Sequence, residues 1–470
     1  MRAKARAVVR LEAARRFALA AVVVAGSSCA REPLPPRGHL RVWIDTNAPV
    51  PGGAGRVAPL LDVVRIEVLT AAGAIVDVRE IPLEAEALRQ GLGFTIVPDG
   101  PSTPAARVHA IAWKASDGRG APRPTESVEG WYVLPAAPEA DAIDVTLRLD
   151  LETTGASVGT AQAPAPPFVG REPSQVGTWA RAARVGCAGA AGDDEVCVPG
   201  GAFWMGHPRA EDLGVRSGGA RRLVVVSPFF VDRHEVSVAA YRRDGKVFAG
   251  RWTGRYGGSD DKDYCTFTDE AGPHDDLPVN CVRWTYAREY CMSRGGDLPS
   301  EAELEYLASA FGASLYPWGE DPPSCADAVW GRGGGGNVGD IRAQPGPCRP
   351  AEGTARERSG SPEPVVRGDV GRDFVALEGG IVHDVVGNLA EWTRDVFASL
   401  DSDCWRPRAP NVLVDPTCVA ASSPPPPSPT FGTRGAAFFY PRSFAVSAVR
   451  SGNVDGASLA VGFRCVRRGR

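Results

Sequence analysis

Four oxygen-bearing side chains flank one tight turn within residues 381–395. Gly387 and Asn388 both tolerate positive φ, so together they predict this turn. Carboxylate oxygens and backbone carbonyls packed around such a turn can hold a hard cation such as calcium. The alternative is a turn held by Asx hydrogen bonds, with a tryptophan as its apolar anchor, and the segment by itself leaves both interpretations open. The side chains concerned are Asp384, Asn388, Glu391 and Asp395, with Trp392 as the anchor.

Cysteine and histidine provide the other candidate ligands. Eleven cysteines are present, and no pair has the CxxC spacing, so neither a zinc site nor a thioredoxin-type redox motif is expected. The six histidines form no i, i+4 pair and no local cluster. Only His234, beside Glu235, and His383, beside Asp384, have an acidic neighbour, and we expect both histidines to be structural.

Two short helices are expected near these residues. Trp284, Ala287, Tyr290 and Cys291 recur at helical spacing and predict one buried stripe. Ser300 followed by Glu303 forms a capping box, which predicts that a second helix begins there. Residues 293–299 join the two helices. A single strand is expected over residues 223–232, and a closing strand over residues 462–466.

The first part of the chain has a different pattern. Apolar and polar residues alternate in seven short segments between residues 40 and 151, as in half-buried strands. This pattern predicts an all-β, immunoglobulin-like sandwich over residues 30–152, and we expect a spacer or adhesion role for it. An Ala, Gly, Thr and Pro-rich stretch predicts a linker over residues 153–185. A second domain then covers residues 186–470.

Residues 1–29 have the features of an export signal. A basic segment ends at Arg16, and an apolar segment over residues 17–26 is too short to span a bilayer. Small residues directly before Cys29 resemble a bacterial lipoprotein cleavage box, with Gly26 where leucine is usual; an ordinary signal peptide is the alternative. We therefore expect an exported protein, lipid-anchored through Cys29 in the cell envelope, at the outer membrane or periplasmic face.

The net charge of the chain indicates which kinds of partner it can bind. The formal net charge is -4, and the basic residues of the signal segment would be lost on export. The remaining chain is acidic, which argues against nucleic acid as the main partner.

Eight short motifs occur in one order between residues 195 and 468. They are PGG-x-F-x-MG, FFVD before Glu235-Val236, PV-x-x-V-x-W, LPSEAELEY, YPWG, DVVGNLAEW, RGAAF and GFRC. Together they resemble the sulfatase-modifying factor family, whose best-known member is the formylglycine-generating enzyme. The resemblance implies a compact, irregular α+β domain of C-type-lectin-like fold with bound calcium.

The resemblance also implies particular ligands. It places calcium at the turn described above, with side-chain ligands and backbone oxygens from Asp384, Val385, Gly387, Leu389 and Glu391. The family's second calcium site falls at Ala328, with Asp327 beside it, and is not expected to be intact.

The family's conserved disulfide bridge corresponds to Cys291 and Cys465. Pairing the other cysteines by proximity gives four more bridges, while the positions of a second family bridge, Ala308 and Ser447, lack sulfur. The four pairs are Cys187–Cys197, Cys265–Cys281, Cys325–Cys348 and Cys404–Cys418.

The family's catalytic residues are not matched. The formylglycine-generating enzyme binds copper through two cysteines that correspond here to Ala437 and Arg442, shortly before the conserved arginine matched by Arg450. A soft cuprous ion selects thiolates, so copper is not expected. The active-site serine of the family falls at Arg434, and the tryptophan inside its turn motif falls at Ala390, so we expect an altered substrate groove.

Two classes of function follow. The first is a non-catalytic binding or scaffold module for an unknown protein, peptide or glycan, tethered to the membrane by its lipid. The second is a formylglycine-generating-type oxidase, or another protein-modifying enzyme, with different metal ligands. The surroundings of Ala437 and Arg442 discriminate between them, because a replacement metal would need a cluster of cysteine, histidine or carboxylate side chains there.

Overall fold

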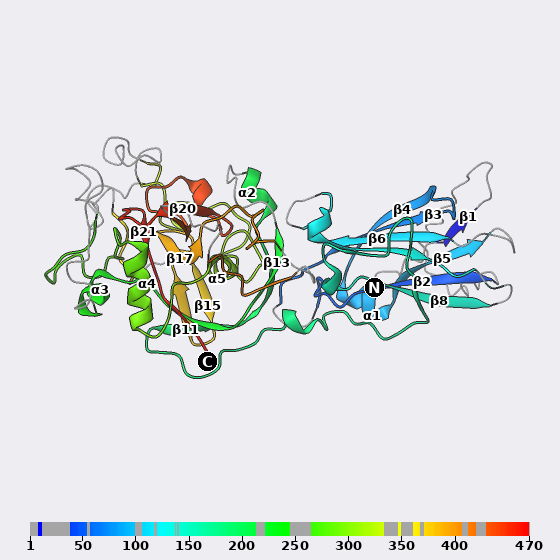
Figure 1. Cartoon of the computed structure of the whole chain (residues 1–470), viewed down its shortest axis with the longest axis horizontal. Coiled ribbons are helices and arrows are strands. Elements are labelled where there is room, and N and C mark those ends of the chain that lie inside the picture. The colour runs from blue at the N-terminus through cyan, green and yellow to red at the C-terminus, as the bar shows by residue number, and fades with distance from the viewer. Residues whose placement is uncertain are drawn as a thin grey trace, which may run out of the picture. The chain divides into compact units, whose positions relative to one another are not determined.

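The computed structural model describes residues 8–11, 38–53, 57–98, 106–116, 120–136, 138, 141–212, 221–244, 265–332, 346–348, 361–366, 371–406, 412–419 and 429–469. The chain divides into two compact units, Met1–Ala182 and Ala183–Arg470 (Figure 1). The predicted lipidation site Cys29 and the apolar segment 17–26 lie outside the described residues. In the described part of the chain, no helix has the length and apolar character needed to cross a membrane.

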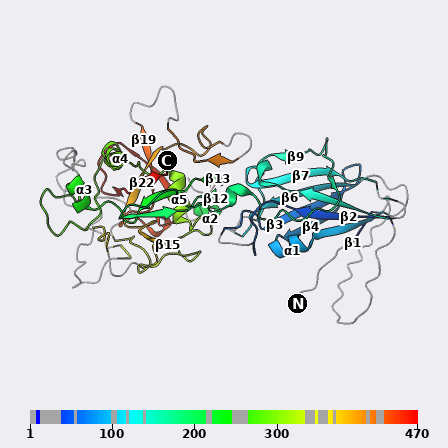
Figure 2. The ribbon, with the colours of Figure 1, turned by 90° about the horizontal axis from the view of Figure 1, so that it is seen from below.

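Two five-stranded sheets form the N-terminal unit, with orders β1-β5-β2-β8-β10 and β4-β3-β6-β7-β9. Figure 2 shows the strands of the second sheet following one another from β9 to β4. All seven strands predicted from alternation are present. The elements are β1 (Val8–Leu11), β2 (His39–Asp45), β3 (Val63–Leu69), β4 (Ile75–Pro82), α1 (Ala85–Gln90), β5 (Leu92–Pro98), β6 (Arg107–Trp113), β7 (Ser127–Val133), β8 (Ala142–Arg148), β9 (Ser157–Val158) and β10 (Phe168–Val169).

The linker predicted over residues 153–185 is wrong for most of its length. Residues 157–158 and 168–169 form β9 and β10, which extend the two sheets of the N-terminal unit. Asp45 then accepts hydrogen bonds from the Ser174 hydroxyl (2.8 Å) and the Gln175 amide (2.9 Å). These long-range bonds hold a stretch that is linker-like in composition against the first unit, which ends at Ala182.

Several small sheets and few helices make up the C-terminal unit, so the expected irregular α+β architecture is confirmed. The sheet orders are β11-β14-β22, β12-β13-β18, β15-β16 and β20-β19-β17-β21. The strands are β11 (Glu195–Val198), β12 (Gly201–Met205), β13 (Arg222–Val226), β14 (Phe229–Asp232), β15 (Phe374–Leu377), β16 (Gly380–His383), β17 (Ala390–Val396), β18 (Leu413–Val414), β19 (Thr430–Arg434), β20 (Arg450–Val454), β21 (Val461–Gly462) and β22 (Val466–Arg468).

The two predicted helices are confirmed as α4 (Trp284–Ser293) and α5 (Glu301–Ala308). Both arms of the capping box are formed: the Glu303 amide donates to the Ser300 hydroxyl (3.1 Å), and the Ser300 amide donates to the Glu303 carboxylate (2.6 Å). Both helices contact β17. Two shorter helices are also present, α2 (Pro208–Asp212) and α3 (Val238–Asp244).

The single strand predicted over residues 223–232 is instead two strands in different sheets. β13 pairs antiparallel with β12, whereas β14 pairs antiparallel with β11. Pro228 lies between them and has no amide hydrogen, so a continuous ladder cannot pass through this point. The closing strand predicted over residues 462–466 is likewise divided between β21 and β22.

Five disulfides are formed in the C-terminal unit, and they join the same cysteines that proximity and the resemblance predict. The bridge with the largest sequence separation, 174 residues, connects α4 to the residue before β22. The five are Cys187–Cys197, Cys265–Cys281, Cys291–Cys465, Cys325–Cys348 and Cys404–Cys418.

Candidate functional site

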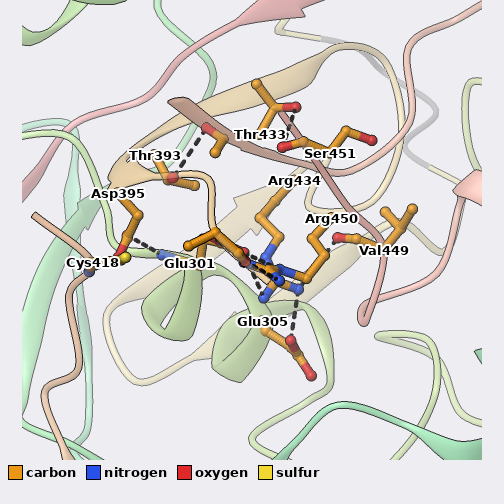
Figure 3. Close-up of polar contacts among 12 residues, drawn as sticks. Glu301, Glu305, Thr393, Asp395, Cys418, Thr433, Arg434, Val449, Arg450 and Ser451 are labelled. Atoms are coloured by element: carbon orange, nitrogen blue, oxygen red, sulfur yellow. Dashed lines mark hydrogen bonds and ion pairs between the residues drawn. The ribbon is translucent and has the colours of Figure 1, made fainter. Parts of the chain in front are cut away.

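A buried network of ion pairs lies where α5 meets β19 and β20 (Figure 3). Glu301 and Glu305 are four residues apart on α5, so both carboxylates project from one face of the helix. Arg434 and Arg450 are direct cross-strand partners in the β19–β20 ladder. Like charges directly opposite in a sheet are unfavourable, and the two glutamates supply the compensating negative charge.

The distances show that each arginine is bound. Arg450 contacts Glu301 through two parallel bonds, Nε to Oε2 at 2.7 Å and Nη2 to Oε1 at 2.7 Å. Arg434 Nη1 lies 2.6 Å from Glu305 Oε2, and its Nη2 lies 3.3 Å from Glu301 Oε2. None of the four residues is more than 4% exposed, so this network is part of the core.

Asp395 adds a third buried carboxyl group to the network. Its two oxygens accept hydrogen bonds from the backbone amides of Glu301 (2.8 Å) and Cys418 (2.6 Å). Burial, and then the negative charge of Glu301, raise the pKa of Asp395 to about 7. A protonated Asp395 leaves two glutamates facing two arginines, which balances the charge inside the network.

This network occupies the position that the resemblance assigns to catalysis. The resemblance assigns the family's active-site serine to Arg434, and the guanidinium of Arg434 is bound by Glu305 and Glu301. The sequence indicated Arg434 and Arg450 but not their partners. The i, i+4 spacing of Glu301 and Glu305 was a signal that could have indicated a shared helix face.

The two positions that the resemblance assigns to copper ligands lie in different environments. Ala437 is fully buried in an apolar cluster with Phe438 and Phe439. Arg442 is exposed, at the start of the 3-10 turn Arg442–Phe444, and its positive charge acts on Tyr316. Within the described residues, no group of three or more His, Cys, Asp or Glu side chains is placed to hold a metal.

The sequence predicted the positive-φ residues of the turn between β16 and β17 only in part. Asn388 has φ 72° and Asp384 has φ 53°. Gly387 is required for space rather than for positive φ. A Cβ at Gly387 would lie 3.0 Å from Asp373 Oδ2 and 3.0 Å from the backbone of Val329, tighter than ordinary contact.

Two carboxylates bind the amides of this turn. Asp373 accepts from the amides of Val385 (3.0 Å), Val386 (3.0 Å) and Gly387 (2.8 Å). Glu235 accepts from the Leu389 amide (3.0 Å) and the Asn388 side chain (2.6 Å). The turn is therefore held together by hydrogen bonds, with Asp373 as a central acceptor that the sequence analysis missed.

The opposite side of the turn carries excess negative charge. Glu391 binds Arg464 through contacts of 2.6 to 2.9 Å, and the same guanidinium bonds to the carbonyls of His383 and Asp384 at 2.9 Å. Asp384 and Glu235 are also buried here. Burial, with the negative charges of Asp384 and Glu391, raises the pKa of Glu235 well above its usual range.

The calcium ion predicted at this turn would lie near these buried acidic residues. Glu235, Asp384 and Glu391 all interact electrostatically with the guanidinium of Arg464, which offsets part of their negative charge. Of the two predicted side-chain ligands, Glu391 is bound to Arg464. The second family site is different, because Arg372 binds the Asp327 carboxylate at 2.6 and 3.0 Å and lowers the pKa of Asp327 to about 2.

Two histidines that are distant in the sequence meet beside this turn, a contact that no local pattern in the sequence indicated. The rings of His234 and His383 stack with their centroids 4.8 Å apart. The His383 amide donates to the Arg233 carbonyl (2.9 Å), which holds β16 next to the end of β14. Burial, and then the neighbouring His383, lower the pKa of His234 to about 4, so this ring is neutral at neutral pH.

Comparisons with known proteins find similar sequences and structures for the C-terminal unit. The chain is 27% identical to the inactive C-alpha-formylglycine-generating enzyme 2 of Bos taurus over 241 residues, which are 44% of this chain and 72% of that protein. Among solved structures, PvdO from Pseudomonas aeruginosa aligns with a TM-score of 0.36 and 19% identity, over 58% of this chain and 94% of that one. Treponema denticola variable protein 1 aligns with a TM-score of 0.35 and 14% identity, over 58% and 94%.

The family match covers the whole C-terminal unit. The model of the sulfatase-modifying factor enzyme 1-like domain matches residues 182–469, which is more than half of the 470 residues. The match begins one residue before the boundary between the two units, at Ala182. The chain therefore belongs to the sulfatase-modifying factor family.

Proposed function

We propose that the C-terminal unit is a non-catalytic binding or scaffold module of the sulfatase-modifying factor family. The observation that carries this proposal is the buried pair of Arg434 and Glu305 at the position of the family's active-site serine. The similarity to the bovine relative, which is itself named inactive, also supports a non-catalytic role.

The energetics of the network support a structural role. Removing one partner of a buried ion pair typically costs ~3–5 kcal/mol, because the other charge is left buried without compensation. A substrate that displaced Arg434 would have to bear this cost at Glu305, whereas Glu301 would keep its two bonds to Arg450. The network therefore favours a closed core over a groove that opens during a reaction cycle.

The proposed setting is the cell envelope. We infer export through residues 1–29 and lipid attachment at Cys29, which tether the protein to a membrane. The N-terminal unit, with its two sheets, would act as an immunoglobulin-like spacer. The module would then present its loops to a protein, peptide or glycan outside the cytoplasm, where disulfides persist.

We also propose a structural calcium ion at the turn between β16 and β17. Asp384 would supply a carboxylate, and Val385, Gly387 and Leu389 would supply backbone oxygens, while Glu391 would act mainly through its bond to Arg464. The support is that three acidic residues, Glu235, Asp384 and Glu391, are buried at this turn. When bound, the ion would rigidify the turn and take no part in a reaction.

Mass spectrometry tests the non-catalytic assignment directly. The full chain is incubated with cuprous copper, oxygen and a cysteine-containing sulfatase peptide, beside an active family member as the positive control. We expect the peptide mass to stay unchanged. Loss of sulfur from the peptide as formylglycine would instead establish the alternative, an oxidase with other metal ligands. Glycan and peptide arrays probed with the full chain, with and without chelator, would then identify the ligand class.

A further inference from the structure

An open sheet edge lies in the N-terminal unit. β4 is the last strand of the order β4-β3-β6-β7-β9, and among the described residues only β3 pairs with it. Two of its apolar side chains are exposed, Ile75 at 55% and Val78 at 50%. A long edge strand with free backbone donors and acceptors can pair with a further strand.

The charges on β4 restrict which strand can pair. Asp77 lies opposite Val68 and Arg79 opposite Ile66 in the ladder, so both charged residues share the face of the sheet on which β3 is buried. Charges on the covered face of an edge strand deter pairing with unrelated strands, because pairing would desolvate them without a partner. A suitable strand must therefore carry the opposite charges in the matching register.

A second copy of β4 meets this requirement, because the strand carries both charges. Around Val78 the charges are complementary, with Asp77 on one side and Arg79 on the other, and isoleucine lies three positions away on both sides, at Ile75 and Ile81. The positions two residues away differ, so that pairing about Val78 places Val76 opposite Glu80. If two copies pair antiparallel about Val78, each Asp77 faces the Arg79 of the second copy. Each Ile75 then faces an Ile81, and the two Val78 side chains meet at the two-fold axis.

The charges of Asp77 and Arg79 are balanced both in the free chain and in the paired one. Within one strand, Arg79 Nε lies 2.6 Å from Asp77 Oδ2, so the free chain leaves neither charge unpaired. On pairing, this contact can be exchanged for two equivalent contacts between the copies. Glu80 projects to the other face and binds Arg65 at 2.5 Å, so it adds no uncompensated charge at the edge.

We propose that β4 pairs antiparallel with the β4 of a second copy of this chain, with the two-fold axis at Val78. One sheet would then be continuous through both copies. A single strand pair buries far less surface than a standard protein interface of ~1,600 Å². The dimer is therefore weak and reversible, and its population rises with protein concentration.

Analytical ultracentrifugation of the full chain over a wide concentration range tests this proposal. We expect a reversible monomer–dimer equilibrium. Val78→Lys places two like charges at the axis and should raise the dimer dissociation constant by at least about tenfold. Val78→Thr is the matched control, because it keeps a β-branched side chain and should change the dissociation constant little.

A charge-swap experiment tests the register. D77R alone or R79D alone places like charges opposite each other and should weaken self-association. A mixture of these two variants should form heterodimers, and the double variant D77R/R79D should recover the wild-type equilibrium. Circular dichroism checks that each variant is folded. A chain that is monomeric at every concentration, a dimer unaffected by Val78→Lys, or a mixture without heterodimers would each overturn the proposal.

Discussion

Arg434 lies in the buried ion-pair network of the C-terminal unit. A serine at this position would leave a small polar group, whereas arginine fills the space and forms ion pairs with Glu305 and Glu301. The arginine and the glutamates therefore depend on each other, since each charge is tolerated in the core only because the opposite charge is present.

Arg434→Met should therefore lower the free energy of unfolding by ~3–5 kcal/mol, because it leaves Glu305 buried without its cation. The double variant Arg434→Met, Glu305→Met should recover part of the loss. Urea unfolding followed by tryptophan fluorescence measures both. Arg442→Met is the control, since this exposed arginine should contribute within ~0.5 kcal/mol. An equally small effect at Arg434 would contradict the buried-pair interpretation.

Asp395 makes the stability of this network depend on pH. Its folded-state pKa is about 7, whereas an unfolded Asp titrates at ~3.9. Between these values the folded chain binds more protons than the unfolded chain, so this group's contribution to stability decreases as pH rises from about 4 to about 7. Asp395→Asn should remove this component and flatten the dependence of Tm on pH.

The control for this measurement is Asp401→Asn. The Asp401 side chain is 96% exposed, so its replacement should leave the pH profile of Tm unchanged. If Asp395→Asn and wild type show the same slope between pH 4 and 7, the raised pKa of Asp395 is wrong.

At the scale of elements, the Cys291–Cys465 bridge connects α4 to the residue directly before β22. Both sulfurs are buried, and the bridge closes a span of 174 residues. In the chain-entropy account, a longer closed loop gives a larger stabilisation.

Cys291→Ser should destabilise the C-terminal unit by ~2–5 kcal/mol, seen as a lower Tm under non-reducing conditions. The matched comparison is Cys325→Ser, which removes a bridge of separation 23 with one exposed cysteine. It should lower Tm less. An unchanged Tm for Cys291→Ser would show that this bridge does not stabilise the fold.

The turn between β16 and β17 should respond to calcium. A ligand that binds only the folded state adds ~2.7 kcal/mol of stability at a concentration one hundred times its Kd. We expect calcium to raise the Tm of chelator-treated protein, and Asp384→Asn to abolish most of that rise. Asp327→Asn should keep it, since Arg372 already binds that carboxylate. Identical Tm values for the wild type with calcium and with chelator would rule out the site.

At the scale of the whole molecule, local patterns in the sequence predicted the helices and strands better than they predicted the contacts between them. Val64, Ile66 and Val68 alternate with charged residues in β3, one of the seven segments where alternation predicted a strand, because the two-residue period is a property of the strand itself. The capping box at Ser300 likewise fixed the start of α5. Both signals lie within a few consecutive residues.

The candidate site was predictable only in part, because its contacts join distant segments. Glu305 and Arg434 are 129 residues apart, and no local pattern pairs them. The stacking of His234 on His383 and the docking of residues 174–175 on Asp45 depend on the assembled fold in the same way. The family resemblance supplied Asp384 and Cys465, whereas Asp373 needed the three-dimensional structure.

The pairing of β14 with β22 also sets an order of events during biosynthesis. The ribosome makes residues 229–232 more than two hundred positions before the strand that must lie beside them. A growing polypeptide that has not yet reached residue 468 exposes the edge of β14, and Cys291 still lacks its partner. The Cys291–Cys465 bridge can therefore close only after residue 465 has been made, 174 positions after its partner.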